Sequence, residues 1–270
     1  TAQSRGITLL HKPFSVKRIS ATADGYAITT ADDKVTTAAQ CIMALGNLPQ
    51  AAATDNTGDR LIDHVWAADL TTIAQNAGNG PVAIIGTGLT MIDMVISLRD
   101  AGYHGKIIGL SRNGLLPLRH DAPQAPYASR AATLSTSPQR LSTLMHAFRI
   151  EARQNHWQAV MDQWRPYLTA LWAKLPALDK ARFLSRHFTR WNIHRHRMAP
   201  AIADIVDAEM AKGTLVLRHG NVRTHATVDG VDIRIGDDTL KAAYALDCRG
   251  PGYDLRRAQS PLLVQMMQDG

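Results

Sequence analysis

The chain has 270 residues and the composition of an ordinary globular protein, with 45% hydrophobic and 20% charged residues. Its formal net charge is +7, and its two cysteines are too few for a disulfide framework. No segment approaches the roughly 18 consecutive apolar residues of a membrane helix, and residues 1–5 do not resemble the start of a signal peptide. These features argue against a mainly disordered, a disulfide-rich or a membrane-spanning protein. We expect a cytoplasmic location and no membrane partner.

An internal repeat organises the sequence. Residues 21–38 and 226–243 carry the same amino acid at eight of 18 aligned positions. Each copy contains an Asp-Gly pair, at 24–25 and 229–230, which is the strongest short signal of a β-hairpin turn. An Asp-Asp pair later in both copies predicts a second turn. Such turn residues recur in many β-rich chains, but the shared order of the surrounding segments favours two parts of the chain built on one plan.

Apolar segments flank both copies of the repeat, and we expect them to be buried strands. A glycine that ends a helix is predicted before each copy, at Gly6 and Gly213. Each last segment contains a cysteine, and we expect Cys41 and Cys248 to be inert thiols of the core. The predicted strands are 7–10 and 41–45 around the first copy and 214–217 and 244–248 around the second.

A strand, a glycine turn, a helix and another strand are predicted before the second copy. Residues 81–85 are wholly apolar, as in a strand covered on both faces, and they run directly into a Gly-Thr-Gly turn. Apolar residues at helical spacing follow from Leu89 to Gly102, and residues 106–110 form the next apolar strand. This order is that of a βαβ unit.

The glycine turn has the pattern that binds the phosphates of a dinucleotide. The first glycine permits a tight turn, the second lets a pyrophosphate approach the backbone, and the helix offers unpaired N–H groups. Met91 departs from the pattern, because a third glycine or an alanine is usual there for close helix–strand packing. The alternative is a structural turn in an unrelated α/β unit. The predicted cofactor-binding residues of the turn are Gly86, Thr87, Gly88, Leu89 and Thr90.

The end of the second strand indicates which dinucleotide is preferred. Units that bind NAD carry an acidic residue there for the ribose 2′-hydroxyl. This chain has Ser111 and Arg112 instead. A hydroxyl and a guanidinium suit a 2′-phosphate, so we expect both residues to bind cofactor and NADP(H) to be preferred over NAD(H). The alternative is an arginine that only faces solvent.

Residues 113–200 are predicted to be an insertion, with a loop rich in proline and serine followed by two or three helices. Trp157, Trp164 and Trp172 lie near heptad spacing, which favours core packing over an aromatic substrate cage. Asp179 is expected to be the N-cap of a helix whose apolar face includes Phe183 and Trp191.

Basic residues concentrate between Arg182 and Arg197, together with three histidines. We expect a solvated basic helix face. A contact with cofactor phosphate is an alternative, since arginine and histidine donate to phosphate. A metal site is not expected, because His194 and His196 would lie on different faces of a helix and no cysteine or carboxylate cluster accompanies them. A nucleic-acid partner is not expected either.

Three loops carry a resemblance to a known class. They read ALGNLP at 44–49, GTGLTMID at 86–93 and CRGPGYDL at 248–255. They resemble the loops of two-dinucleotide-domain flavoproteins, which are related to glutathione reductase and flavin monooxygenases, and especially a bacterial group of FAD/NAD(P)-binding proteins. Leu45 and Arg249 stand where threonine is common in that group. The segment from Trp191 to Pro200 also resembles it.

This resemblance implies an FAD-dependent oxidoreductase that transfers hydride from NADPH to flavin and then to an unknown small-molecule acceptor. The loops that leave and re-enter the FAD domain would contribute four more cofactor-binding residues. No residue is an evident acid, base or nucleophile, so no catalytic residue is predicted. The four residues are Gly46, Asn47, Gly250 and Pro251.

The expected fold is α/β: a Rossmann-like NAD(P)-binding domain with a parallel sheet, a β-meander and a helical insertion, and part of a second Rossmann-like domain of the FAD type. We expect the NAD(P) domain at 64–249, with the insertion at about 134–200, and the partial FAD-type domain at 1–63 and 250–270. The glycine motif for the FAD pyrophosphate would precede Thr1, so the chain is expected to be a fragment. The alternative function is a non-catalytic dinucleotide-binding or interaction module.

Overall fold

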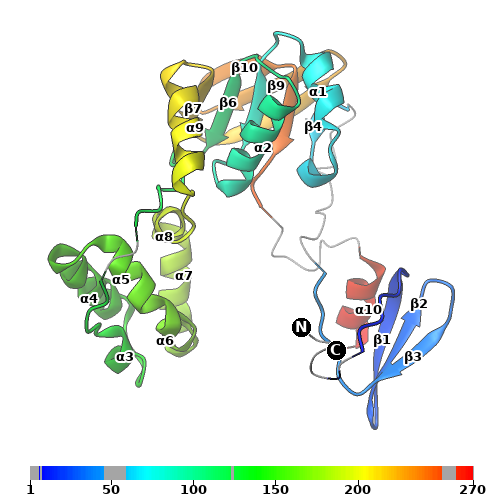
Figure 1. The fold of residues 1–270 in the computed structure, drawn as a ribbon, viewed down its shortest axis with the longest axis vertical. Helices are drawn as coiled ribbons and strands as arrows, with labels where there is room; N and C mark the ends of the chain where they lie inside the picture. Colours follow the sequence, from blue (N-terminus) through cyan, green and yellow to red (C-terminus); the bar gives the residue numbers. More distant parts are fainter. Residues whose placement is uncertain (1–5, 7, 46–58, 123–124, 251–259, 270) are drawn as a thin grey trace. The chain divides into compact units, whose positions relative to one another are not determined.

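The computed structural model describes residues 6, 8–45, 59–122, 125–250 and 260–269 (Figure 1). The chain divides into two compact units, one of Thr1–Asn56 with Gly250–Gly270 and one of Thr57–Arg249. None of the helices in the described ranges has the length and apolar character needed to cross a membrane.

A five-stranded parallel sheet forms the centre of the second unit, in the order β4-β11-β5-β6-β7. Its central strands are continuous apolar runs, and all four residues of β5 are buried. A strand that is covered on both faces needs this pattern. The strands are β4 (Leu61–Ile62), β5 (Val82–Ile85), β6 (Ile107–Ser111), β7 (Leu215–His219) and β11 (Tyr244–Asp247).

Different layers cover the two faces of this sheet. On one face, Val82 and Ile84 pack into a core with helices α1 (Leu70–Ala77), α2 (Leu89–Asp100) and α9 (Pro200–Ala211); Figure 1 shows α2 and α9 over the strands. On the other face, the alternate residues of β5 pack against an antiparallel meander. The meander consists of β8 (Val222–Thr227), β9 (Gly230–Ile235) and β10 (Asp238–Ala242). The predicted parallel sheet, meander and glycine-turn helix are therefore confirmed.

The insertion between β6 and α9 contains more and shorter helices than expected. Pro166 lies in the short 3-10 helix η3 (Arg165–Tyr167), and another break at His187 divides the single helix expected around Phe183 and Trp191. Trp164 is buried in the core of the insertion, whereas Trp172 is partly exposed. The α-helices are α3 (Ala131–Leu134), α4 (Leu141–Gln154), α5 (Trp157–Trp164), α6 (Leu168–Lys174), α7 (Ala177–Arg186) and α8 (Phe188–Arg195).

Asp179 is not the N-cap that the sequence predicted. Helix α7 begins two residues earlier, and the buried Asp179 carboxylate instead accepts the N–H of Leu141 at 3.0 Å, at the start of α4. Its pKa lies below the usual range, because this backbone hydrogen bond outweighs the effect of burial and Arg140 adds to it. The carboxylate therefore caps a neighbouring helix that is remote in sequence.

The first unit holds a second meander, of β1 (Val16–Thr22), β2 (Gly25–Thr30) and β3 (Val35–Ala38), with α10 (Pro261–Asp269) against β1. Gln265 of α10 accepts the N–H of Ile19 at 3.0 Å and donates to its carbonyl. The side-chain amide therefore ties the helix to the backbone of the strand.

The flanking strands predicted at 7–10 and 41–45 are wrong for the described residues, 8–10 and 41–45, which are irregular. Leu9 is 76% exposed and Ile42 is 92% exposed. In the second copy the matching strands pair with β6 and β5, but the described part of the first unit offers no parallel strand to pair with. Cys41 is accordingly only half-buried and lies outside any strand, contrary to the prediction of a core thiol.

The repeat itself is present in three dimensions, with one difference. Gly25 and Gly230 occupy the same place: a Cβ on either would lie 2.3–2.4 Å from a carbonyl oxygen of the third strand. The second turns differ by one residue, because Thr30 pairs with Lys34 while Ile235 pairs directly with Asp238. Asp33 takes a φ of 64° in the longer turn, and Gly236 takes 59° in the shorter one. The aligned Asp-Asp pairs therefore lie at different turn positions.

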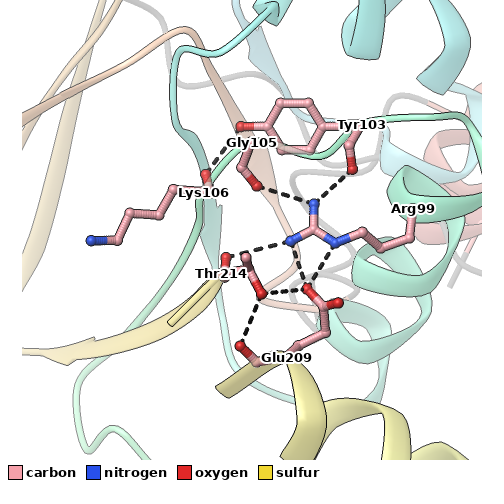
Figure 2. Close-up of polar contacts among 6 residues, drawn as sticks. All are labelled: Arg99, Tyr103, Gly105, Lys106, Glu209 and Thr214. Atoms are coloured by element: carbon pink, nitrogen blue, oxygen red, sulfur yellow. Dashed lines mark hydrogen bonds and ion pairs between the residues drawn. The ribbon is translucent and has the colours of Figure 1, made fainter. Parts of the chain in front are cut away.

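A polar cluster joins α2, α9 and the strands that they cover (Figure 2). The guanidinium of Arg99 lies 2.7 Å from the Glu209 carboxylate and donates to the carbonyl oxygens of Tyr103, Gly105 and Thr214. Thr214 donates to Glu209 as well. Both charged side chains are about 15% exposed. Leaving a charged side chain unpaired at this degree of burial would destabilise the fold. The ion pair therefore holds the end of α9 to the end of α2.

We predict that Glu209→Gln lowers the free energy of unfolding by about 2 kcal/mol, because it leaves the Arg99 charge largely buried without its counter-ion. Urea unfolding followed by circular dichroism measures the change. The matched control is Asp238→Asn, which breaks the exposed ion pair to Arg218 and should cost less than about 1 kcal/mol. Equal effects of the two variants would contradict the proposed role of the cluster.

The same carboxylate predicts a pH dependence. Burial acts to raise the pKa of Glu209, but the hydrogen bonds from Arg99 and Thr214 prevail and lower it. A lowered pKa stabilises the fold above the ordinary glutamate pKa, and this contribution is lost as the pH falls toward the folded-state value. The difference in unfolding free energy between the parent and Glu209→Gln should therefore shrink below about pH 4.5. A difference that stays constant from pH 7 to pH 3 would refute this explanation.

Candidate functional site

Polar loops gather at the carboxyl edge of the parallel sheet. The chain passes from β5 through α2 to β6 on one side of β5, while β11 lies on the other side. The strand order reverses at β5, and ligands of open α/β sheets bind in the crevice at such a point. The loops that leave this edge contain Asp63 after β4, Gly86 after β5, Arg112 after β6 and Arg249 after β11.

Gly86 allows two of these loops to meet. Its φ is +98°, and its N–H donates to the carbonyl of Leu110 at 2.7 Å. A Cβ on Gly86 would lie 2.6 Å from the carbonyl oxygen of Cys248. Any side chain there would therefore force the ends of β5 and β11 apart.

Gly88 leaves the start of α2 open. It is the N-cap residue of that helix, and no side chain caps the helix there. A Cβ on Gly88 would meet no atom within 4 Å among the described residues. The first N–H groups of a helix have no intrahelical acceptor, and the helix dipole adds positive charge at this end. The start of α2 can thus receive an anionic group close to the backbone.

Thr87 and Ser111 join the glycine turn to the loop after β6. The Thr87 hydroxyl donates to the carbonyl of Leu115 at 2.6 Å, and it lies 2.9 Å from the hydroxyl oxygen of Ser111. Ser111 also accepts the N–H of Gly114 at 3.0 Å. A hydroxyl has only one proton to give, so Ser111 donates its own proton to Thr87. The predicted contact of Ser111 with a 2′-phosphate would have to share a hydroxyl that already holds this loop.

Arg112 is exposed beside this loop. Within the part of the chain that the structure describes, its guanidinium has no hydrogen bond and no ion pair. The neighbouring hydroxyls fix the backbone on which it stands. Arg112 is therefore available to an anion at the end of β6.

The missing third glycine of the turn is compensated on the neighbouring strand. Met91 is fully buried in the first turn of α2 and packs over Gly109, in the middle of β6. A Cβ on Gly109 would lie 2.8 Å from the Met91 sulfur and 2.8 Å from Leu217. The strand thus supplies the space that a glycine of the helix usually supplies, and close packing of α2 is retained.

Charged residues that the sequence motifs did not assign to the site lie at the same edge. Arg249 binds the Asp247 carboxylate at 2.5 Å. Burial and the negative charge of Asp247 raise the pKa of Asp63, at the end of β4. The departure of Arg249 from the family loop was the available signal. Cys248 lies between Asp247 and Arg249 in the sequence. Burial, together with the negative charges of Asp247 and Asp93, raises the pKa of its thiol to about 12, as expected of an inert core thiol.

The predicted residues of the flavin loops are mostly not described. Gly46, Asn47 and Pro251 lie outside the described residues. Gly250 is exposed and has a φ of +91°, a conformation that favours glycine. Leu89 and Thr90 are half-buried at the start of α2, beside Gly88. The structure thus brings the predicted glycine-turn residues together with Ser111 and Arg112 at one edge of the sheet.

No protein-family model matches the chain, and no curated protein sequence matches it. Among solved structures it is similar to L-lysine 6-monooxygenase from Pseudomonas syringae, with a TM-score of 0.53 and 14% identity over 94% of this chain and 56% of that chain. It is also similar to DfoA from Erwinia amylovora, a cadaverine monooxygenase bound to FAD, with a TM-score of 0.53 and 11% identity over 98% of this chain and 57% of that chain.

The chain shares the fold of these two proteins, an α/β fold built on a parallel sheet. This confirms the fold class that the sequence predicted. The chain spans little more than half the length of either of these proteins. At such identities the likeness concerns the fold alone.

We predict that Gly109→Ala destabilises the protein by about 1–3 kcal/mol, because the added methyl group overpacks the contact with Met91. In a double-mutant cycle with Met91→Ala, the combined loss should be smaller than the sum by about 1 kcal/mol, since removing the thioether makes room. Urea unfolding gives the four free energies.

Met94→Ala is the matched control for this cycle. Met94 is also buried on α2, but it is not among the atoms nearest to Gly109. Its effect should add to that of Gly109→Ala. Coupling of similar size in both cycles would show that Gly109 does not act through Met91.

Proposed function

We propose that this chain binds NADP(H) at the carboxyl edge of its parallel sheet and is the pyridine-nucleotide part of an FAD-dependent oxidoreductase. The observation that carries the proposal is the pairing of an open helix start at Gly88 with an available guanidinium at Arg112, on adjacent strand ends. The strand order reverses beside them, where dinucleotides bind in such sheets.

Each part of the site suits one part of the cofactor. The N–H groups at the start of α2 would receive the pyrophosphate, and Gly86 and Gly88 would let it approach the backbone. Arg112 would bind the 2′-phosphate through paired donors. Thr87 and Ser111 would hold the two loops at the required separation through their hydrogen bond. The end of β6 carries Ser111 and Arg112 in place of the acidic residue that would bind the 2′-hydroxyl of NAD(H), so the site favours NADP(H).

The proposed reaction is hydride transfer from NADPH to flavin, with an unknown small molecule as the final electron acceptor. The FAD bound in DfoA, which shares the fold, supports flavin as the second cofactor. The residues predicted to contact the flavin cofactor remain those of the two loops that leave and re-enter the FAD domain: Gly46, Asn47, Gly250 and Pro251. The task of this chain would be to bind and orient the nicotinamide nucleotide. The cytoplasmic location also remains a prediction.

Calorimetric titration of the 270-residue chain tests the nucleotide site. NADP⁺ should bind more tightly than NAD⁺. Arg112→Ala should weaken NADP⁺ binding by about 10- to 100-fold, the loss expected for charge-assisted hydrogen bonds, and should leave NAD⁺ binding nearly unchanged.

Arg223→Ala is the matched control, because Arg223 is an exposed arginine of β8 for which the structure describes no side-chain partner. It should leave the affinity for both nucleotides unchanged. Equal losses for both nucleotides in Arg112→Ala would show that this residue does not recognise the 2′-phosphate. Absence of binding to either nucleotide would refute the site in this chain.

A further inference from the structure

The basic segment at the end of the insertion has two different roles in the structure. Arg197 is almost fully buried: its guanidinium binds Asp162 at 2.6 Å and Gln158 at 2.7 Å. It therefore holds α5 to the end of the insertion. Arg195 is exposed, and its only described side-chain contact is with the ring of His196, at 2.6 Å. Its charge has no acidic partner among the described residues.

Arg195 lines a basic pocket of about 430 Å³. The other lining residues are His120, Asp162, Arg165 and Arg197. The single carboxylate is already bound by Arg197 and lies 3.8 Å from Arg165, so three guanidinium groups face one carboxylate. The pocket therefore carries an excess of positive charge that an anion would balance.

Arg195 also lines an apolar cavity of about 390 Å³ between α4, α6, α7 and α8. Aromatic rings in edge-on or tilted contact fix its wall: Phe148 with Trp164 at 5.3 Å, Phe148 with Trp191 at 5.6 Å and Phe183 with Trp191 at 5.8 Å. Its size lies in the range of small-molecule pockets, which are mostly apolar with a few polar groups. Apolar cavities take apolar guests rather than water.

One face of α8 connects the two pockets. Phe188, Trp191 and Arg195 follow the spacing of residues that share a helix face, and all three line the apolar cavity. The face is aromatic over its first turn and cationic at its last residue. A ligand that meets this face needs an apolar body and an anionic end.

We propose that the helical insertion binds an amphipathic carboxylic acid, with its apolar chain in the cavity and its carboxylate on Arg195 at the edge of the basic pocket. Guanidinium and carboxylate form paired, charge-assisted hydrogen bonds, which suits this end of the site. The proposal is independent of the nucleotide site, because it uses none of the residues at the carboxyl edge of the sheet.

The test uses dodecanoate as the probe, below the concentration at which it forms micelles, with the full chain. Isothermal calorimetry and tryptophan fluorescence should report saturable binding of one molecule per chain. Arg195→Gln should weaken dodecanoate binding by about tenfold or more, and should leave binding of dodecanol, which has no charge, unchanged. Thr169→Trp should block both probes, because Thr169 is an exposed residue that lines the cavity.

Arg190→Gln is the matched control, since Arg190 is exposed on α8 but lines neither pocket. It should leave both affinities unchanged, and circular dichroism shows whether each variant is folded. Failure of dodecanoate to bind the parent chain would overturn the proposal, as would equal weakening by Arg195→Gln and Arg190→Gln.

A second copy of the chain is the competing occupant of the cavity. Sedimentation velocity tests this directly. A dimer that Leu184→Lys converts to a monomer would show that the cavity is a contact face between copies, because Leu184 is a half-exposed residue of its wall, and it would overturn the proposal. A parent chain that sediments as a monomer and binds dodecanoate supports it.

Discussion

The contact of Arg99 with Glu209 holds together two parts of the parallel sheet that the chain itself separates widely. Strands β6 and β7 are neighbours, yet residues 112–214 lie between them. The ion pair joins the ends of α2 and α9, and Arg99 also binds the carbonyls that lead into β6 and β7 (Figure 2). An insertion of this length makes closure of the crossover costly in entropy. A largely buried ion pair with further hydrogen bonds fixes the crossover in one geometry, and the opposite edge can then carry loops free to bind a ligand.

The glycine turn shows that close packing belongs to a pair of positions rather than to one residue. The usual motif places a small residue on the helix where it crosses the strand. Here the helix carries a large side chain, Met91, and the strand carries a glycine, Gly109. The helix axis stays near the sheet in either arrangement, so the free N–H groups of α2 remain at the strand ends. A departure from the motif at Met91 is therefore weak evidence against nucleotide binding when the facing strand carries a glycine.

Local signals predicted much of the second unit, since a βαβ unit and Asp-Gly hairpins are encoded within a few residues. The prediction of strands at 7–10 and 41–45 was wrong because local sequence does not determine strand pairing. An apolar segment becomes a strand only beside a partner strand, and that partner is remote in sequence. The role of Asp179 was also not predictable from local sequence, because its carboxylate caps a helix whose start lies 38 residues away in sequence. At the candidate site the backbone pattern predicted Gly86 and Gly88, but the hydrogen bond of Thr87 to Ser111 and the burial of Asp63 depend on contacts that no spacing reveals.

The arginines that give the chain its positive charge have different roles in the structure. A net charge of +7 is compatible with one polyanion-binding face. The structure instead buries most of the Arg99 and Arg197 side chains, each paired with a carboxylate, and leaves Arg112 and Arg195 exposed without acidic partners among the described residues. Arg112 and Arg195 lie on different elements, one after a strand of the parallel sheet and one at the end of a helix of the insertion. Under the two proposals made above, each of these arginines binds one anionic group, which a guanidinium can hold through paired hydrogen bonds.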